Sequence, residues 1–322
     1  MRRLRTAWKW GHALAVAVAG ATLVAPALAG TPAKAARGGG DPSTDKLAQI
    51  LARGTLILST DPAYPPQSYR VKGVVRLAHT KCAANQLTGN QMAGYDVDTS
   101  KLVAQGLRVE PCFVTPTWSE QISGHWGDRW DIAFASMGIT RERMTRLYFT
   151  QPYSAEAERF FVRKSSSVKS VQQLSGKRLG GCTGCFAQNY IQRNLDLPGE
   201  QVRFLVDRAT FVGYDVERNG LADVARGKLD AFLCGVAVGG KAIADGLPLK
   251  SVGSDQYVAY LSGAVDRSSG LSASAFIARV NTIVLRLQAR GMLRRASLKY
   301  FHTDFASRAD HFDVSRLQQR VS

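Results

Sequence analysis

The sequence is short of the features that mark several large classes of protein. It contains five histidines, and His79, His125, His302 and His311 stand far apart, without the spacing of metal ligands. No Ser/His/Asp order and no neighbouring pair of carboxylates stands out. The Lys and Arg residues are scattered rather than interleaved with aromatic residues, although the formal net charge is +17. We therefore expect no metal, no cofactor and no nucleic-acid partner.

Long apolar runs are also scarce. The run at residues 13–29 carries no charge, but it is shorter than the roughly 20 residues that a membrane span needs, and Pro26 interrupts it. Basic residues precede it, and Ala27-Leu28-Ala29 matches a small-residue cleavage signal. The pattern predicts a secretory signal peptide, residues 1–29, with an uncleaved anchor as the alternative. No cysteine follows to carry a lipid, and we expect a periplasmic or secreted protein.

Cysteine is limited to five residues. In an oxidising compartment most cysteines pair, and an odd count leaves one over. Cys82 and Cys112 lie in the first half of the chain, so we predict a bridge between them. Cys182 and Cys185 can close on each other, or either can pair with Cys234.

The remaining 293 residues (322 − 29) are enough for two lobes. Stretches with strand and helix character alternate twice along them, which predicts an α/β protein with sheets in the middle. Residues 30–44 are predicted to be disordered, Thr44 to cap a first helix, residues 149–153 to form a turn, and residues 302–322 to form a polar tail. Expected strands include 55–60, 108–115, 159–163, 177–181, 202–206, 229–234, 249–252 and 258–265, and expected helices 45–52, 95–105, 186–194, 216–226, 238–245, 272–290 and 293–300, with another after Ser165.

The segment 131–143 combines groups that suit a carboxylate. A short apolar strand ends at the small polar residues Ser136 and Gly138, and Thr140 then offers an N-cap for a helical turn that carries Arg143. Arginine presents a planar fork of donors that binds a carboxylate through two hydrogen bonds. The alternative is an arginine on the solvated surface.

Other chemically distinctive residues also follow predicted strands. Asp61 and Tyr64 come directly after the first strand, and Trp118 follows the strand at 108–115. Ligands of α/β sheets bind beyond the ends of the strands. This pattern favours one shared binding site. The alternatives are a loop-capping role for Asp61 and ordinary hydrophobic packing for the two rings.

The order of several stretches resembles the family 3 bacterial extracellular solute-binding proteins, the polar amino-acid receptors of ABC importers. These stretches are GTLILSTDPAYPPQSY, GYDVDTSKLVAQGL, VTPTWSEQI, WDIAFASMGITRERMTRLYFTQPY and SVQQLSGKRLGG. The resemblance covers residues 45–301 and implies a two-lobed, type II periplasmic-binding-protein fold with hinge-linked lobes. Lobe 1 would comprise residues 45–155 and 259–301, and lobe 2 residues 156–258.

The resemblance also implies roles for individual residues. Arg143 would bind the α-carboxylate of the ligand, and Tyr64 and Trp118 would form aromatic walls. The remaining contacts would come from Asp61 and from the strand end at Ser136, Met137 and Gly138. The second lobe would contribute Cys185, Phe186 and Gly235.

Two positions depart from the family pattern. Many members hold the α-ammonium with an aspartate at the position that corresponds to Gly235, and they carry a hydroxyl where this chain has Phe186. A buried ammonium without a partner costs several kcal/mol. The ligand would therefore be an amino acid held by another acid such as Asp61, or a carboxylate without the amine.

The expected function is an exported, monomeric receptor that closes around a small carboxylate-bearing solute and docks on an ABC-transporter permease. One alternative is a dehydratase-like enzyme on the same fold, with Asp61 or Glu158 as its acid or base. Another alternative is a redox protein that uses the Cys182-x-x-Cys185 turn. The order of the surrounding elements does not match a thioredoxin domain and argues against this alternative.

Overall fold

A nine-stranded mixed β-sheet runs through the described part of the protein. In the computed structural model, residues 40–198 and 200–321 are described, and all belong to the unit Gly38–Ser322. The sheet order is β10-β9-β11-β8-β12-β7-β1-β6-β4. Its strands are β1 (Thr55–Ser59), β4 (Leu87–Thr88), β6 (Glu110–Val114), β7 (Ile132–Ala133), β8 (Leu147–Arg163), β9 (Arg178–Cys182), β10 (Thr210–Tyr214), β11 (Ala231–Gly235) and β12 (Leu249–Asp266).

A small second sheet lies beside the first half of the large one. It has the order β2-β3-β5, with β2 at Ala63–Tyr64, β3 at Ser68–Arg70 and β5 at Met92–Ala93. The short strand β2 follows the Asp61 loop and carries Tyr64. The sheet therefore holds this loop beyond the end of β1, where the sequence predicts a site.

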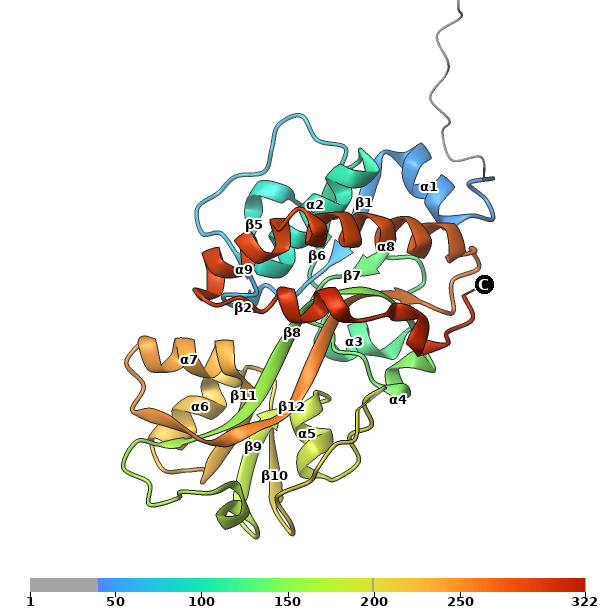
Figure 1. The fold of residues 1–322 in the computed structure, drawn as a ribbon. Helices are drawn as coiled ribbons and strands as arrows, with labels where there is room; N and C mark the ends of the chain where they lie inside the picture. The colour runs from blue at the N-terminus through green and yellow to red at the C-terminus, as the bar shows by residue number, and fades with distance from the viewer. Residues whose placement is uncertain (1–39, 199, 322) are drawn as a thin grey trace, which may run out of the picture. The chain divides into compact units, whose positions relative to one another are not determined.

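The helices form two groups around the two halves of the large sheet (Figure 1). One group packs around β1 and β6, and the other around β9, β10 and β11. The first group is α1 (Lys46–Arg53), α2 (Tyr95–Leu107), α8 (Ser274–Ala289) and α9 (Met292–Phe301), followed at the strand ends by α3 (Trp118–Ser123) and α4 (Arg141–Met144). The second group is α5 (Phe186–Ile191), α6 (Glu217–Ala225) and α7 (Val236–Ala244).

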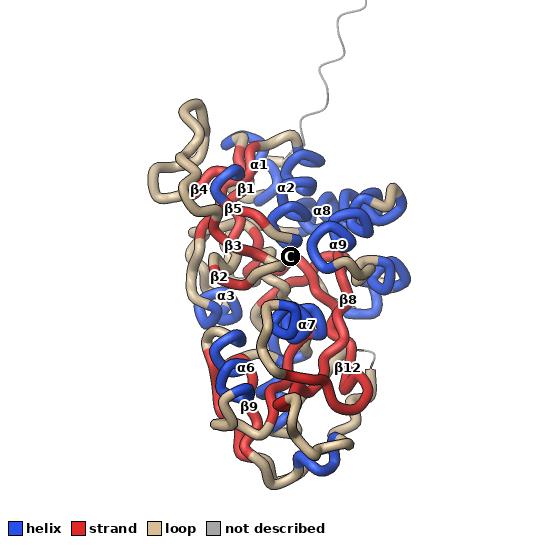
Figure 2. The backbone as a smooth tube through the Cα atoms, turned by 90° about the vertical axis from the view of Figure 1, so that its left-hand side faces the viewer, coloured by secondary structure: helices blue, strands red, loops and turns tan. Residues whose placement is uncertain are grey.

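The strands β8 and β12 connect these two groups. They pair antiparallel over nearly their whole length, from Leu147 opposite Asp266 to Arg163 opposite Leu249, with irregularities in register between. Figure 2 shows them next to each other from the side. Each lobe is thus built on one half of a shared sheet. The lobe boundaries given above stay predictions.

Three expected elements are wrong. Residues 149–153 form no turn but belong to β8, where Pro152, which has no N–H to donate, lies at a register shift opposite β12. Residues 202–206 form no strand, because the Tyr190 hydroxyl accepts from the Leu205 N–H and donates to the Arg203 carbonyl. Only the 3₁₀ turn Val171–Leu174 replaces the helix expected after Ser165.

The ends of the described chain also differ from expectation. Asp45 rather than Thr44 caps α1, accepting from the Ala48 N–H at 2.7 Å. Residues 40–44 form a hydrogen-bonded turn rather than a disordered segment. The polar tail folds back onto the sheet, because the Gln319 side chain bonds both backbone groups of Phe149 and Leu317 is buried. The predicted signal peptide and residues 30–39 lie outside the described residues.

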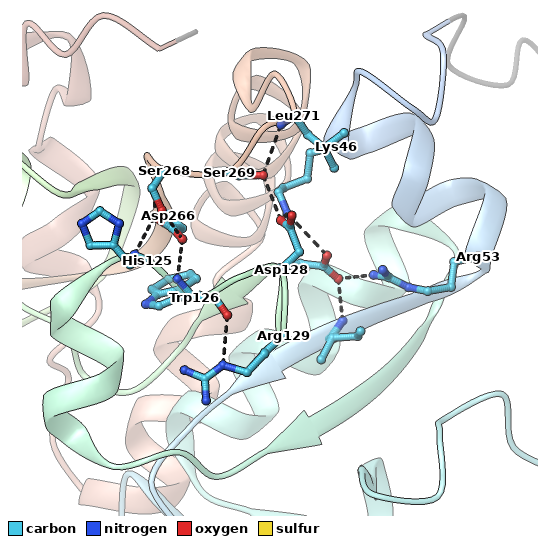
Figure 3. Close-up of polar contacts among 12 residues, drawn as sticks. Lys46, Arg53, His125, Trp126, Asp128, Arg129, Asp266, Ser268, Ser269 and Leu271 are labelled. Carbon is cyan, nitrogen blue, oxygen red and sulfur yellow. Dashed lines mark hydrogen bonds and ion pairs between the residues drawn. The ribbon is translucent and has the colours of Figure 1, made fainter.

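Buried charges fix the start of the segment 131–143 (Figure 3). Asp131 is 2% exposed and accepts from Arg53 and from the Ile57 N–H. Lys46 is equally buried and donates to Asp128 at 3.1 Å. A buried carboxylate is stable only when it is paired and hydrogen-bonded. These bonds tie β7 to α1 and β1, and they set the direction in which the chain continues to Arg143.

Both disulfides use pairings that the sequence allows. Cys82–Cys112 joins the segment before β4 to β6, as predicted. Cys182–Cys185 closes on itself, which leaves Cys234 buried and free. Among the described residues, no helix is long and apolar enough to cross a membrane, and no group of metal-ligating side chains comes together.

Candidate functional site

A cavity of about 390 Å³ lies where the two halves of the sheet meet. Eight of the ten predicted ligand-binding residues line it: Asp61, Tyr64, Trp118, Ser136, Gly138, Arg143, Cys185 and Phe186. Further lining residues come from β8, β12, α6 and α7, and these include Glu158, Asp215, Glu217, Arg218, Lys241 and Asp245. The structure thus brings residues from distant parts of the sequence to one cavity of the size of a small-molecule site.

Arg143 is a buried cation at one end of this cavity. It is 3% exposed, and the Thr140 hydroxyl caps its helix, as predicted, by accepting from the Arg143 N–H at 3.0 Å. The Nη1 and Nη2 groups donate to the carbonyls of Gly138 and Gly184, each at 2.9 Å. Burial lowers the pKa of Arg143 to about 10. No carboxylate pairs with Arg143 among the described residues.

Two rings flank the guanidinium. The Trp118 and Phe186 ring centroids each lie 5.0 Å from its central carbon, which is cation–π distance. A Cβ on Gly138 would lie 2.0 Å from the Phe186 ring, so the ring occupies the space that this glycine leaves. Phe186 therefore walls the cation rather than supplying the polar contact that the family usually places there. The indole Nε1 of Trp118 is buried without a hydrogen-bond partner among the described residues.

Ser136 is held in place by a buried acid. Its backbone is left-handed, with φ at +48°. Its hydroxyl donates to Asp96 at 2.8 Å, and its N–H donates to the Tyr153 hydroxyl, which itself donates to Asp96 at 2.9 Å. Burial raises the pKa of Asp96 to about 7. Both donors of Ser136 are thus used within the protein, and its hydroxyl oxygen is left to accept from a ligand.

Asp61 and Tyr64 lie on the wall formed by the small sheet. Asp61 accepts from the Ala63 N–H at 2.7 Å, so it caps its own loop as well as lining the cavity. Burial raises its pKa. Tyr64 packs against a core cluster of the opposite lobe that includes Phe161, Leu221 and Phe232. Asp61 therefore both caps its loop and lines the cavity, and Tyr64 both packs against the core and lines the cavity.

Met137 and Gly235 do not line the cavity. Met137 is fully buried in a core cluster with Ile57 and Trp126, away from the cavity lining. A Cβ on Gly235 would lie 2.4 Å from Oε1 of Glu156. The predicted ligand contacts of these two residues are corrected accordingly.

Glu156 fills the space that Gly235 leaves open. It is 5% exposed, projects from β8, and accepts from the Ala237 N–H in the first turn of α7 at 2.8 Å. Burial raises its pKa to about 7, although the bond from Ala237 acts to lower the pKa. A carboxylate thus reaches the beginning of α7 from the neighbouring strand, at the place where many family members carry an aspartate.

Two carboxylates near Glu156, those of Glu158 and Glu217, line the cavity, whereas Glu156 itself lies behind the lining residues. Burial, Glu156 and Glu217 raise the pKa of Glu158 well above its usual range. Burial and Glu156 raise the pKa of Glu217 to about 8, while the Tyr64 hydroxyl acts to lower it. Oε2 of Glu217 is buried without a hydrogen-bond partner in the described chain. We call Glu156, Glu158 and Glu217 the acid end.

The sequence pattern does not indicate the acid end as a binding site. It marks Glu158 only as a candidate acid of an enzyme, and it gives Glu156 and Glu217 no role. One signal was present: Glu156 and Glu158 alternate with alanine in a central strand, so both carboxylates lie on one face. The charges at the rim, by contrast, are paired, because Arg218 and Lys241 both donate to Asp245, at 2.7 and 2.9 Å.

Comparison with known families identifies the chain. The model of the bacterial extracellular solute-binding proteins, family 3, matches residues 82–303. The chain belongs to this family. Within it, ABC transporter arginine-binding protein 1 of Escherichia coli K12 is 25% identical over 216 residues, which are 66% of this chain and 83% of that protein. The L-cystine-binding protein TcyJ of the same strain is 22% identical over 260 residues, 80% of this chain and 86% of that protein.

Solved structures confirm the predicted fold. A mutant of the arginine-binding protein of T. maritima matches with a TM-score of 0.63 and 20% identity over 80% of this chain and all of that one. The ancestral amino acid-binding protein AncCDT-1, described as a precursor of cyclohexadienyl dehydratase, matches with a TM-score of 0.64 and 23% identity over the same shares. The α/β class and the two-lobed type II fold are therefore as predicted.

Proposed function

We propose that this protein captures a small α-amino acid in the cavity and delivers it to an ABC-transporter permease. The observation that carries the proposal is Arg143, a buried guanidinium that lines the cavity with no carboxylate of the described chain to neutralise it. A ligand carboxylate would supply the missing negative charge through the guanidinium donors that the two carbonyls leave unused. Family membership and relatives named for amino-acid binding support the same reading.

Glu156 supplies the partner for the ammonium group. The family pattern predicts an acid at Gly235, and the structure has a carboxylate from β8 in the adjoining space. An amino acid bound with its carboxylate at Arg143 and its ammonium at Glu156 has both charges compensated. The rings of Trp118 and Phe186 would cover the bound group and keep water from it. This arrangement favours an amino acid over a carboxylate without an amine.

The wider role rests on the family. The protein would be exported by its predicted signal peptide, act as a monomer, and present its liganded form to a permease. Contacts across the cavity, such as the bond from Arg143 in α4 to Gly184 before α5, belong to the closed arrangement that a ligand would stabilise. We expect the lobes to separate about β8 and β12 in the absence of ligand.

The test is calorimetric titration with a panel of L-amino acids, each binder being compared with its decarboxylated amine. We expect the amine to bind at least roughly 30-fold more weakly, because the buried guanidinium then stays unpaired. Equal affinity for an amino acid and its decarboxylated form would overturn the carboxylate assignment.

An enzyme on this fold is the second candidate. The raised pKa of Glu156, to about 7, is the property that a general acid near neutral pH needs. Incubation of the protein with each binder and mass spectrometric analysis of the mixture distinguishes the two. Unchanged solute at one-to-one stoichiometry supports a receptor, and release of a smaller product supports a dehydratase-like enzyme.

A further inference from the structure

We propose that Glu158 and Glu217 form a subsite for a second positive charge, so that the ligand is an amino acid with a cationic side chain. This inference rests on the proposed function and names its substrate class. Arg143 and Glu156 account for the carboxylate and the ammonium that every α-amino acid carries. Glu158 and Glu217 remain, and neither forms an ion pair with another described residue.

The balance of charge in the cavity supports a cationic ligand. The chain as a whole is basic, with 42 Lys and Arg against 25 Asp and Glu. The cavity is the reverse: five acids line it against three cations, and Glu156 adds a sixth acid beside it. Two of the cations, Arg218 and Lys241, are bound to Asp245. The third cation, Arg143, is assigned to the carboxylate of the ligand.

The two glutamates are not explained by the fold alone. Glu217 lies in the first turn of α6, where the helix dipole favours a negative charge. That accounts for part of its stability but not for Oε2, which is buried without a partner. Glu158 is in the middle of β8, away from any helix start, and its side chain makes no hydrogen bond with another described residue. Both side chains are half-buried in the cavity wall. A half-buried carboxylate without a partner is costly, and a ligand cation would remove that cost.

The spacing along β8 fits one kind of ligand. Glu156 and Glu158 are two residues apart in a regularly paired stretch, opposite Ala259 and Tyr257. Residues i and i+2 of a strand share a face and lie roughly 7 Å apart. An ammonium bound at Glu156 and a second cation at Glu158 would thus be separated by the length of an extended side chain such as that of lysine, ornithine or arginine.

Tyr257 lies next to this region, behind the residues that line the cavity. Tyr257 is 6% exposed and its hydroxyl has no hydrogen-bond partner in the described chain. It pairs with Glu158 across β8 and β12. Besides the acids, the region holds the Tyr64 hydroxyl next to Glu217. The Tyr64 hydroxyl offers an acceptor to an ammonium or a guanidinium in addition to the two carboxylates.

The experiment compares charged ligands with neutral counterparts of similar shape. L-arginine is titrated against L-citrulline, and L-lysine against L-norleucine, by calorimetry. We expect one charged member to bind roughly 30-fold or more tightly than its neutral counterpart, because the latter leaves the carboxylates unpaired. The double variant Glu158→Gln/Glu217→Gln should bring the two affinities to within a few-fold. The exposed Asp207, in the same lobe, gives the control Asp207→Asn, which should keep the preference.

The outcomes separate this inference from the proposed function. Neutral and charged amino acids that bind equally well, both depending on Arg143, would overturn the second-cation subsite and leave the amino-acid receptor standing. A preference that survives the double substitution would also overturn the subsite. Failure of every amino acid to bind would overturn both proposals. If the double variant does not fold, each single variant carries the test, since each removes one carboxylate and should reduce the preference.

Discussion

The two ends of the cavity are built on opposite principles. At the Arg143 end a single charge is buried with its protein contacts already made: two carbonyls, two rings and a cap within its own helix. At the acid end three carboxylates lie together, and only Glu156 has a backbone donor. The first end has its protein partners in place and suits one group, the carboxylate. The second is electrostatically unsatisfied, and its affinity depends on the charge of the ligand.

Removal of Arg143 should have the largest effect on binding. We expect Arg143→Met to lower affinity for the preferred amino acid by roughly 2–5 kcal/mol, because the ligand carboxylate would lose a buried charged partner. Arg141→Met is the matched control, since Arg141 lies two residues earlier, is exposed and pairs with Asp196. Calorimetry gives both affinities. Equal affinities for the two variants would show that the Arg143 end does not bind the carboxylate.

This end of the cavity is the one that the sequence predicts well. The Thr140 cap and the position of Arg143 three residues later follow from local rules that hold in any context. The same is true of Trp118, which begins a helix behind the capping box of Thr117 and Glu120. Even here, the rings on both faces of the guanidinium come from different lobes, and no local rule brings Phe186 to Gly138.

The acid end is hidden from the sequence for a physical reason. Glu156 and Glu217 are 61 residues apart (217 − 156) and meet only because β8 lies beside β11 and α6. The family pattern places the acid at Gly235, which has no side chain. The carboxylate that takes its place, that of Glu156, comes from the neighbouring strand β8. The wrong strand at 202–206 has a similar origin, because a hydroxyl from Tyr190 takes its backbone groups. Long-range side-chain contacts override local pattern in both cases.

A side chain at Gly235 should have the next largest effect. We expect Gly235→Ala to lower the free energy of unfolding by roughly 1–3 kcal/mol, since the new Cβ and Glu156 would occupy the same space. It should also weaken amino-acid binding by displacing the carboxylate. In the same helix region, Gly240 has open space around its Cβ position, so Gly240→Ala should raise stability by about 0.5–1 kcal/mol. Denaturant unfolding of both variants measures the difference.

The opposite result would change the comparison between the ends. If Gly235→Ala is as stable as the parent protein and binds as tightly, the Glu156 carboxylate does not need the space beside Gly235. Glu156 would then no longer be the proposed partner of the ligand ammonium. The double variant Gly235→Asp/Glu156→Gly, which restores the family arrangement, should recover binding relative to Glu156→Gly alone.

The acid end should also make the empty protein pH-sensitive. The pKa values of Glu156 and Glu217 are raised to about 7 and about 8, whereas an unfolded glutamate titrates near about 4.3. Between these values the folded state holds protons that the unfolded state has lost. Stability of the empty protein should therefore fall as pH rises from 5 to 8, by several kcal/mol. A cationic ligand favours the ionised carboxylates, so its affinity should rise over the same range.

Several titratable groups contribute to this dependence of stability on pH. The groups around Glu156 are the Ala237 N–H, Gln67, Asp96, Glu158, Glu217 and Tyr64. Asp96 has its own raised pKa, of about 7, and adds a slope of the same sign. Glu156→Gln should flatten part of the dependence in denaturant unfolding at pH 5, 6, 7 and 8. Identical slopes for parent and variant would mean that Glu156 titrates normally in the folded protein.

The disulfide Cys182–Cys185 should have the smallest effect on binding. It closes the turn that carries Gly184, whose carbonyl accepts from Arg143. Gly184 is also held by the bond from its N–H to the Gln188 side chain at 2.7 Å, so opening the disulfide leaves a second restraint. We expect Cys182→Ser/Cys185→Ser to weaken binding by about threefold or less, which is below the 1.4 kcal/mol of a tenfold change.

The other disulfide provides the control for that measurement. Cys82–Cys112 closes a segment of the chain between residues 30 apart, and neither cysteine lines the cavity. Cys82→Ser/Cys112→Ser should lower the free energy of unfolding by roughly 2–4 kcal/mol and leave the affinity unchanged. A large loss of affinity on opening Cys182–Cys185, with the Cys82–Cys112 variant unaffected, would show that the turn rather than Gln188 positions Gly184. The Arg143 end would then depend on the redox state of the protein, and the acid end would not.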